Sequence, residues 1–101
     1  MDKKLTFEVT KDYFHLAPAS ELYRMLRKAC RETGSSIHLR TPYKCKTRPS
    51  EYVIDGSAGE TFMMLEQLVN TKEGERIELS FYPPVPDEYL SEFEKEIRPL
   101  F

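Results

Sequence analysis

His15 is the side chain best suited to chemistry in this sequence, because it precedes a predicted amphipathic helix in the string His15-Leu16-Ala17-Pro18-Ala19. A neutral imidazole nitrogen is a competent nucleophile near neutral pH. The first turn of a helix tolerates proline because its N–H groups have no intrahelical acceptor, and those groups favour an anion. The segment could therefore carry a transient phosphohistidine, with Leu16, Ala17 and Pro18 around the phosphoryl oxygens. A histidine beside a helix end also occurs with a purely structural role, so the motif leaves both interpretations open.

Hydrophobic periodicity predicts the elements that must position this segment. Alternation of apolar and polar residues predicts strands over 4–9, 36–40 and 76–81, and the segment 52–55 is predicted as a further strand. Between the first two of these strands, an apolar stripe at helical spacing predicts a helix that ends at Gly34. The stripe consists of Leu22, Met25, Leu26, Ala29 and Cys30.

Two further helices are predicted. The turn over 56–59 would open a short helix with Ser57 as its N-cap and with Phe62, Leu65, Leu68 and Val69 inward. A last helix runs from about Asp87 to Arg98, after a proline-rich connection. The order βαββαβα predicts one α+β domain over residues 1–101, with an antiparallel sheet and its helices on one face.

Composition excludes several classes of protein. The longest apolar run, Phe62-Met63-Met64-Leu65, is far shorter than the ~20 residues of a membrane helix, so membrane insertion is not expected. The first residues lead into an alternating segment rather than an apolar stretch, which predicts a cytoplasmic protein. Cys30 and Cys45 have neither the number of a disulfide framework nor the spacing of a zinc site. We therefore expect no metal and no cofactor.

Charge is divided unequally along the chain. Residues 1–50 carry 11 basic and 5 acidic side chains, whereas residues 51–101 carry 4 basic and 12 acidic ones. This asymmetry predicts charge-guided docking on the first half of the chain. Two oppositely charged surfaces that happen to follow chain order remain the alternative.

The element order, the histidine at the first strand–helix junction and the string His-x-x-Pro-Ala together resemble HPr, the histidine-containing phosphocarrier family of the bacterial sugar phosphotransferase system. Further similarity lies over 8–10, 60–68 and 74–80. The resemblance implies an open-faced β-sandwich with a four-stranded antiparallel sheet and three helices on one face. It also implies that His15 accepts a phosphoryl group from the phosphoenolpyruvate-dependent enzyme of that system. His15 would then pass the group to sugar-transporter subunits or to a regulator.

Departures from the family pattern leave a second function open. The family has an arginine two residues after its histidine, where this chain has Ala17, and alanine offers no donor to a phosphoryl group. The family's Gly-Leu before the histidine is Tyr13-Phe14 here. The alternative is a non-catalytic HPr-like binding module that docks on a regulatory protein and has lost efficient phosphotransfer.

Thr61 aligns with the serine that is phosphorylated by a regulatory kinase in part of the family. The resemblance implies that it lies at the start of the second helix as a possible regulatory site. Glu60 beside it would repel a phosphate, and an ordinary first-turn threonine is the alternative.

Residues 40–48 form a basic insertion relative to the family, with four cations around one tyrosine. It could be a basic finger for an acidic partner or a phosphate backbone, or a solvated hairpin extension. No stripe of exposed aromatic residues accompanies it, so nucleic acid is not an expected partner.

His38 is the second histidine of the chain. It alternates with inward Ile37 and Leu39, which places its side chain toward solvent.

Overall fold

The structure, a computed structural model, describes residues 3–11, 13, 20–40, 49–82 and 85–101. In chain order its elements are β1 (Lys3–Glu8), α1 (Glu21–Glu32), β2 (Ser36–Leu39), β3 (Ser50–Asp55), β4 (Thr61–Thr71), β5 (Gly74–Tyr82), α2 (Asp87–Ile97) and the 3-10 helix η1 (Arg98–Leu100). The described strands form one sheet in the order β1-β5-β4-β3-β2, and every neighbouring pair is antiparallel. The predicted α+β class and antiparallel sheet are confirmed.

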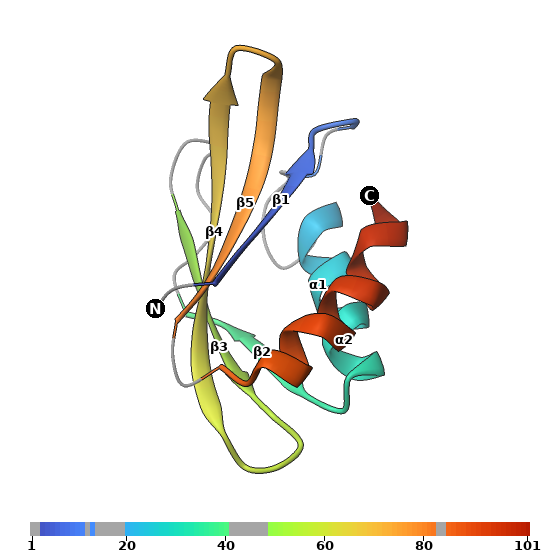
Figure 1. Ribbon diagram of the computed structural model, residues 1–101, viewed down its shortest axis with the longest axis vertical. Coiled ribbons are helices and arrows are strands. Elements are labelled where there is room, and N and C mark those ends of the chain that lie inside the picture. Colours follow the sequence, from blue (N-terminus) through green and yellow to red (C-terminus); the bar gives the residue numbers. More distant parts are fainter. Residues whose placement is uncertain (1–2, 12, 14–19, 41–48, 83–84) are drawn as a thin grey trace.

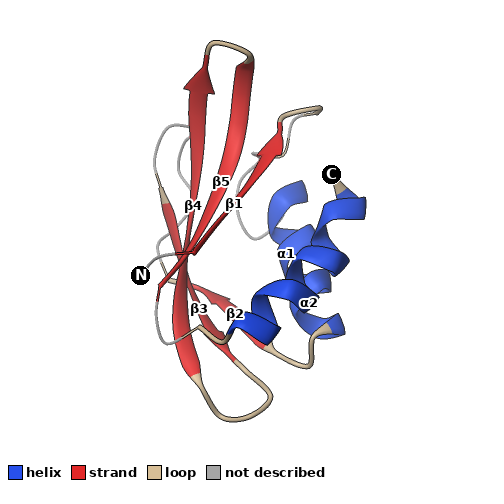
Figure 2. Cartoon of the chain, in the orientation of Figure 1, coloured by secondary structure: helices blue, strands red, loops and turns tan. Residues whose placement is uncertain are grey.

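The molecule has two layers, a twisted sheet and the helices α1 and α2, which lie together on one face of it (Figures 1 and 2). Alternate residues of each strand point toward the helices, so the core lies between the layers. The strands contribute buried side chains that include Phe7, Tyr52, Ile54, Phe62, Met64, Ile77, Leu79 and Phe81. The helices contribute Leu22, Met25, Leu26, Ala29 and Cys30 from α1, and Tyr89, Phe93 and Ile97 from α2.

The predicted second helix is wrong, because residues 61–71 form the long strand β4. Phe62, Met64 and Glu66 alternate with less buried neighbours and face the helices, as strand residues do. Glu66 is a polar residue on that inward face, and it interrupts the apolar alternation that would have predicted a strand. The described residues therefore form five strands and two α-helices, in place of the four strands and three helices that the resemblance implied.

The turn over 56–59 exists, but it joins β3 to β4 instead of opening a helix. The Gly56 N–H donates to the Glu60 carbonyl at 2.8 Å, and the Gly59 N–H donates to the Gly56 carbonyl at 3.1 Å. Gly59 has φ +91°, a conformation that a side chain disfavours. Ser57 is consequently a turn residue and not the predicted N-cap.

A long hairpin of β4 and β5 extends past both helices (Figure 1). The residues at its tip are Thr71 and Gly74, which pair across the two-residue turn of Lys72 and Glu73. The Thr71 hydroxyl also donates to the Gly74 carbonyl at 2.7 Å. In the order of strands, β5, β4 and β3 lie inside the described sheet, and β1 and β2 are its two outer strands.

Candidate functional site

The predicted phosphoryl site lies outside the described residues. His15, Leu16, Ala17 and Pro18 all fall within 14–19, so their roles stay predictions. The residues on either side of this segment are described. Tyr13 is fully buried, with its hydroxyl 2.7 Å from the Thr10 hydroxyl and its ring tilted against Phe101, 5.2 Å between centroids.

The N-terminus of α1 begins later than predicted. Ser20 is its N-cap, and the Ser20 hydroxyl accepts from the Tyr23 N–H at 3.0 Å. The Leu22 N–H donates to the Tyr13 carbonyl at 3.2 Å, and the Arg24 N–H donates to the Ser20 carbonyl at 3.2 Å. The described helix α1 thus begins at Glu21, and the prediction that places Pro18 in a first helical turn lies outside the described residues. Three consecutive amides at this helix end already have protein acceptors.

Thr61 lies at the start of β4 and not at a helix N-terminus. Its hydroxyl donates to the Asp55 carboxylate at 2.9 Å on the exposed surface. A phosphate on Thr61 would lose this hydrogen bond and meet the negative charge of Asp55. Thr61 therefore lacks the position at the start of a helix that the resemblance implied for a regulatory site, and its phosphorylation stays a prediction.

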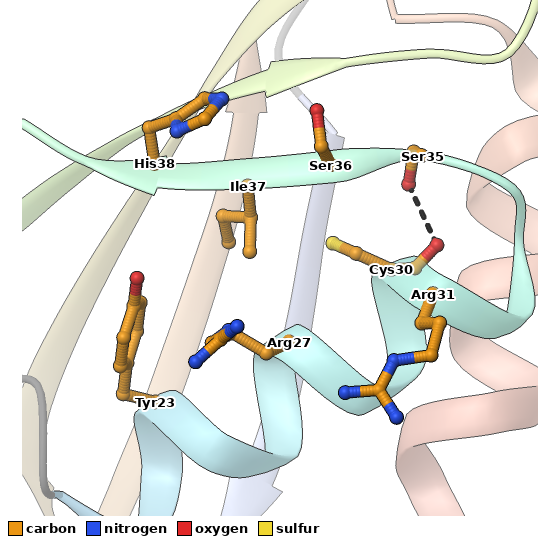
Figure 3. A pocket seen from close by; sticks show the side chains of 8 residues that line it. All are labelled: Tyr23, Arg27, Cys30, Arg31, Ser35, Ser36, Ile37 and His38. Atoms are coloured by element: carbon orange, nitrogen blue, oxygen red, sulfur yellow. Dashed lines mark hydrogen bonds between the residues drawn. The ribbon is translucent and has the colours of Figure 1, made fainter.

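A groove of about 450 Å³ lies between α1 and β2 (Figure 3). Its wall on the helix side comes from Tyr23, Arg27, Cys30 and Arg31, and its wall on the strand side comes from 35–38. In Figure 3 the Ile37 side chain points into the space above α1, Tyr23 rises toward the strand from the other side, and Arg27 extends along the helix toward Tyr23. The lining of the groove therefore combines apolar surface with charged and hydroxyl-bearing side chains.

The cations of α1 form a stripe on the side of the helix away from the core. Arg24, Arg27, Lys28 and Arg31 are exposed and spaced i, i+3, i+4, i+7. Within the described part of the chain, none of the four makes an ion pair. The Arg27 guanidinium lies over the Tyr23 ring, 5.8 Å from its centroid. We call these four residues the α1 cation stripe, and its Arg27 and Arg31 line the groove.

A hydrogen-bonded cluster fixes the end of the groove where α1 turns into β2. The Ser35 hydroxyl donates to the Cys30 carbonyl at 3.0 Å and lies 3.0 Å from the Tyr89 hydroxyl. The Cys30 thiol lies 3.5 Å from the same Tyr89 hydroxyl. Burial raises the pKa of the Cys30 thiol and, well above its usual range, the pKa of the Tyr89 hydroxyl. Cys30 is consequently a protonated packing residue and not a nucleophile, as its place on the apolar stripe predicted.

His38 is exposed on the opposite face of the sheet, as predicted, with its Nε2 3.7 Å from the Asp55 carboxylate. The Thr61 hydroxyl donates to the same carboxylate and not to the imidazole. A hydrolytic triad needs a hydroxyl that is hydrogen-bonded to the imidazole, so these three residues do not form one.

Of the basic insertion over 40–48, Arg40 is described, and its guanidinium lies 3.9 Å from the Glu51 carboxylate. Residues 41–48 lie outside the described residues.

In comparisons with known proteins, no family model, no curated protein and no solved structure matches the chain. Among the described residues, no cluster of His, Cys, Asp or Glu side chains is placed to hold a metal ion. None of the described helices is long and apolar enough to cross a membrane.

Sequence reasoning identified the basic half of the chain but missed the groove. The spacing of the α1 cation stripe was visible in the sequence and could have marked one helix face as a binding surface. The position of β2 at an edge was not visible, because it depends on the sheet order. The sequence analysis predicted no strand order within the sheet, and it took β4 for a helix.

Proposed function

We propose that this chain is a protein-binding module that docks an acidic partner on the α1 cation stripe. The observation that carries the proposal is a row of four exposed cations that make no ion pair with described residues. Such unpaired charges attract an oppositely charged partner at a distance and pair with it on contact. The proposal corresponds to the binding-module alternative and requires no chemistry at His15.

The groove beside the stripe favours a protein partner. Both cations that line the groove are arginines, and arginine can donate two parallel hydrogen bonds to one carboxylate or phosphate group. Ile37 and Tyr23 add apolar surface between them. Glu32 in the last turn of α1 would repel a continuous phosphate backbone that extends past this end of the helix, whereas Glu21 at the other end is already paired with Lys11 at 3.0 Å. These features support an acidic polypeptide over a nucleic acid.

The test uses a fluorescein-labelled acidic peptide, Gly-Ser-Val-Asp-Val-Glu-Val-Ser-Gly, and fluorescence anisotropy. We expect saturable binding that weakens as salt is raised. The double variant Arg27→Glu/Arg31→Glu should bind about tenfold more weakly or worse, since it loses two exposed ion pairs of roughly 0.2–1 kcal/mol each and adds repulsion between like charges. The matched control is Lys72→Glu/Lys95→Glu, which changes the net charge equally at exposed positions on the hairpin tip and on α2.

Two results would overturn the proposal. One is that the Arg27→Glu/Arg31→Glu variant and the control variant bind the peptide equally well. The net charge of the protein, and not the α1 cation stripe, would then determine the affinity. The other is binding of a single-stranded oligodeoxynucleotide more tightly than the acidic peptide, with loss in the Arg27→Glu/Arg31→Glu variant. That second result would assign the stripe to nucleic acid.

A further inference from the structure

The groove runs along a strand at the edge of the described sheet. β2 pairs with β3 on one side, and no other described strand lies against it. A strand in this position exposes a row of backbone N–H and C=O groups to which another extended chain can bind. The groove is lined by consecutive residues 35–38, whose side chains point to both faces of the sheet. It is therefore the space beside the edge of β2, and not a pit in one face.

The hydrogen-bonding pattern identifies the backbone groups that point into this space. The Arg40 N–H donates to the Glu51 carbonyl at 2.7 Å, which makes Arg40 and Glu51 a hydrogen-bonded pair. Bonded and non-bonded pairs alternate in an antiparallel ladder. His38 and Ser36 therefore bond toward β3 as well, and Ile37 and Leu39 turn their N–H and C=O groups toward the free edge.

The turn between β3 and β4 gives the same assignment independently. The Gly56 N–H donates to the Glu60 carbonyl, so the next bonded pair of the β3–β4 ladder is Ile54 with Phe62. Val53 then directs its backbone groups to β2, where its register partner is His38. The hydrogen bonds near both ends of β3 therefore give the same result. The backbone N–H and C=O groups of Ile37 and Leu39 point away from β3.

Side-chain direction relates this edge to the α1 cation stripe. Residues directly opposite each other in an antiparallel pair place their side chains on the same face. A residue that bonds to Ile37 or Leu39 would therefore point its side chain toward the helix layer, as Ile37 does (Figure 3). The charges on that side of the groove are Arg27 and Arg31. Carboxylates at alternate positions of the added chain would meet them.

A second copy of this chain fits the edge poorly. Two β2 strands paired around a two-fold axis would bring the Arg27 and Arg31 side chains of both copies to one interface. Like charges brought together across an interface oppose association. Charge complementarity therefore selects an acidic segment as the occupant.

We propose that an extended acidic segment of a partner protein binds along β2 as an additional antiparallel strand, with alternate carboxylates on Arg27 and Arg31. This inference specifies how the proposed function is carried out, and it rests on that function. Because β2 has four residues, the added strand would make its backbone contacts at Ile37 and Leu39.

Backbone methylation of the same acidic peptide tests strand addition without changing charge. One version carries N-methyl groups on its Asp and Glu, whose N–H groups would face β2. The matched control carries them on the first and last Val, whose N–H groups would face away. We expect the first version to bind at least about tenfold more weakly than the unmodified peptide, the effect of two lost hydrogen bonds. The control should bind within about twofold of it.

Amide hydrogen exchange provides the readout on the protein. Saturating peptide should slow exchange at Ile37 and Leu39, while Ser36 and His38 are already protected in the free protein. A Leu39→Pro variant removes one outward donor and leaves the β3 ladder intact, so it should weaken binding in the same way as peptide methylation.

The outcomes separate this inference from the proposed function. Equal binding of both methylated peptides with retained sensitivity to Arg27→Glu/Arg31→Glu would overturn strand addition and leave acidic docking in place. Protection of Ile37 and Leu39 amides in the free protein, or dimerisation through this edge in light scattering, would also overturn it. Loss of all charge-dependent peptide binding would instead overturn the proposed function itself.

Discussion

The ring of Phe101 lies flat on the ring of Phe7, with centroids 4.1 Å apart and planes inclined by 4°. The Arg98 guanidinium lies over the same Phe7 ring at 4.7 Å. Phe101 also contacts Tyr13, which begins the segment leading to His15. The last residues therefore join β1 to the region before α1, and the aromatic contacts hold the two ends of the described chain together.

This relationship predicts that Phe101→Ala destabilises the fold. Substituting a fully buried phenylalanine by alanine costs about 3–5 kcal/mol of stability. Because Phe101 is half-buried, we expect the free energy of unfolding to fall by roughly 1–3 kcal/mol. Urea unfolding monitored by circular dichroism measures it. Ser91→Ala on the exposed surface of α2 is the control and should change the value by less than about 0.5 kcal/mol. An equal effect of both substitutions would contradict the packing role of Phe101.

A buried hydrogen bond on the helix-facing side of the sheet predicts a second stability effect. The Tyr52 hydroxyl donates to the Glu66 carboxylate at 2.6 Å, and both side chains are buried. Tyr52→Phe removes a donor from a buried carboxylate, so we expect a cost of about 1–3 kcal/mol. Tyr82→Phe is the matched control, because Tyr82 is only half-buried and its hydroxyl makes no hydrogen bond to the described residues. Similar unfolding midpoints for the two variants would argue against the importance of this pair.

The amphipathic elements were predictable from sequence, and the central strand was not. The stripe on α1 and the alternation in β1, β2 and β5 each bury one face, so the pattern is unambiguous. In β4, Met63 and Leu65 are apolar on the open face and Glu66 is polar on the buried one. Alternation therefore fails there. The signal that was missed is Gly74 ahead of the alternation over 76–81, because a tight turn directly before one strand is typical of a hairpin with another strand ahead of it.

Raised pKa values at Cys30 and Tyr89 predict a loss of stability in alkali. The folded state holds both protons more tightly than the unfolded chain does, so the contribution of these two groups to the free energy of unfolding is fully present at lower pH. It should fall as the pH rises above the pKa of an unfolded thiol, about 8.5. In a Cys45→Ser background, we expect Cys30→Ala to flatten this fall between about pH 8.5 and 10. Urea unfolding across this range checks the slope, and an unchanged slope would mean that Cys30 does not contribute.

Phosphotransfer by His15 has its own test. The chain is incubated with phosphoenolpyruvate and the general phosphotransferase enzyme of its host, alongside an ordinary HPr as positive control. As a binding module it should gain no acid-labile phosphoryl group, because the Ala17 side chain lacks the donors of the family's arginine and the amides of Leu22 and Tyr23 already have acceptors. Intact-mass spectrometry measures the product. A phosphoryl adduct that disappears in His15→Ala would establish the chain as a carrier.

The same substitution separates carrier chemistry from docking. Under the proposed function, His15→Ala should bind the acidic peptide within about twofold of the unaltered chain, since the binding residues lie on α1 and β2. Anisotropy titration measures this directly. A large loss of affinity would place the phosphoryl segment and the groove in one site.

The β4–β5 hairpin reaches beyond the helices to the two-residue turn of Lys72 and Glu73. Chain inserted at such a tip displaces no core side chain, and its entropic cost rises slowly with its length. This is the point at which the domain can accept a reporter or a further module without disturbing the groove. It is also the point at which descendants of this sequence could differ most in length while keeping the same fold.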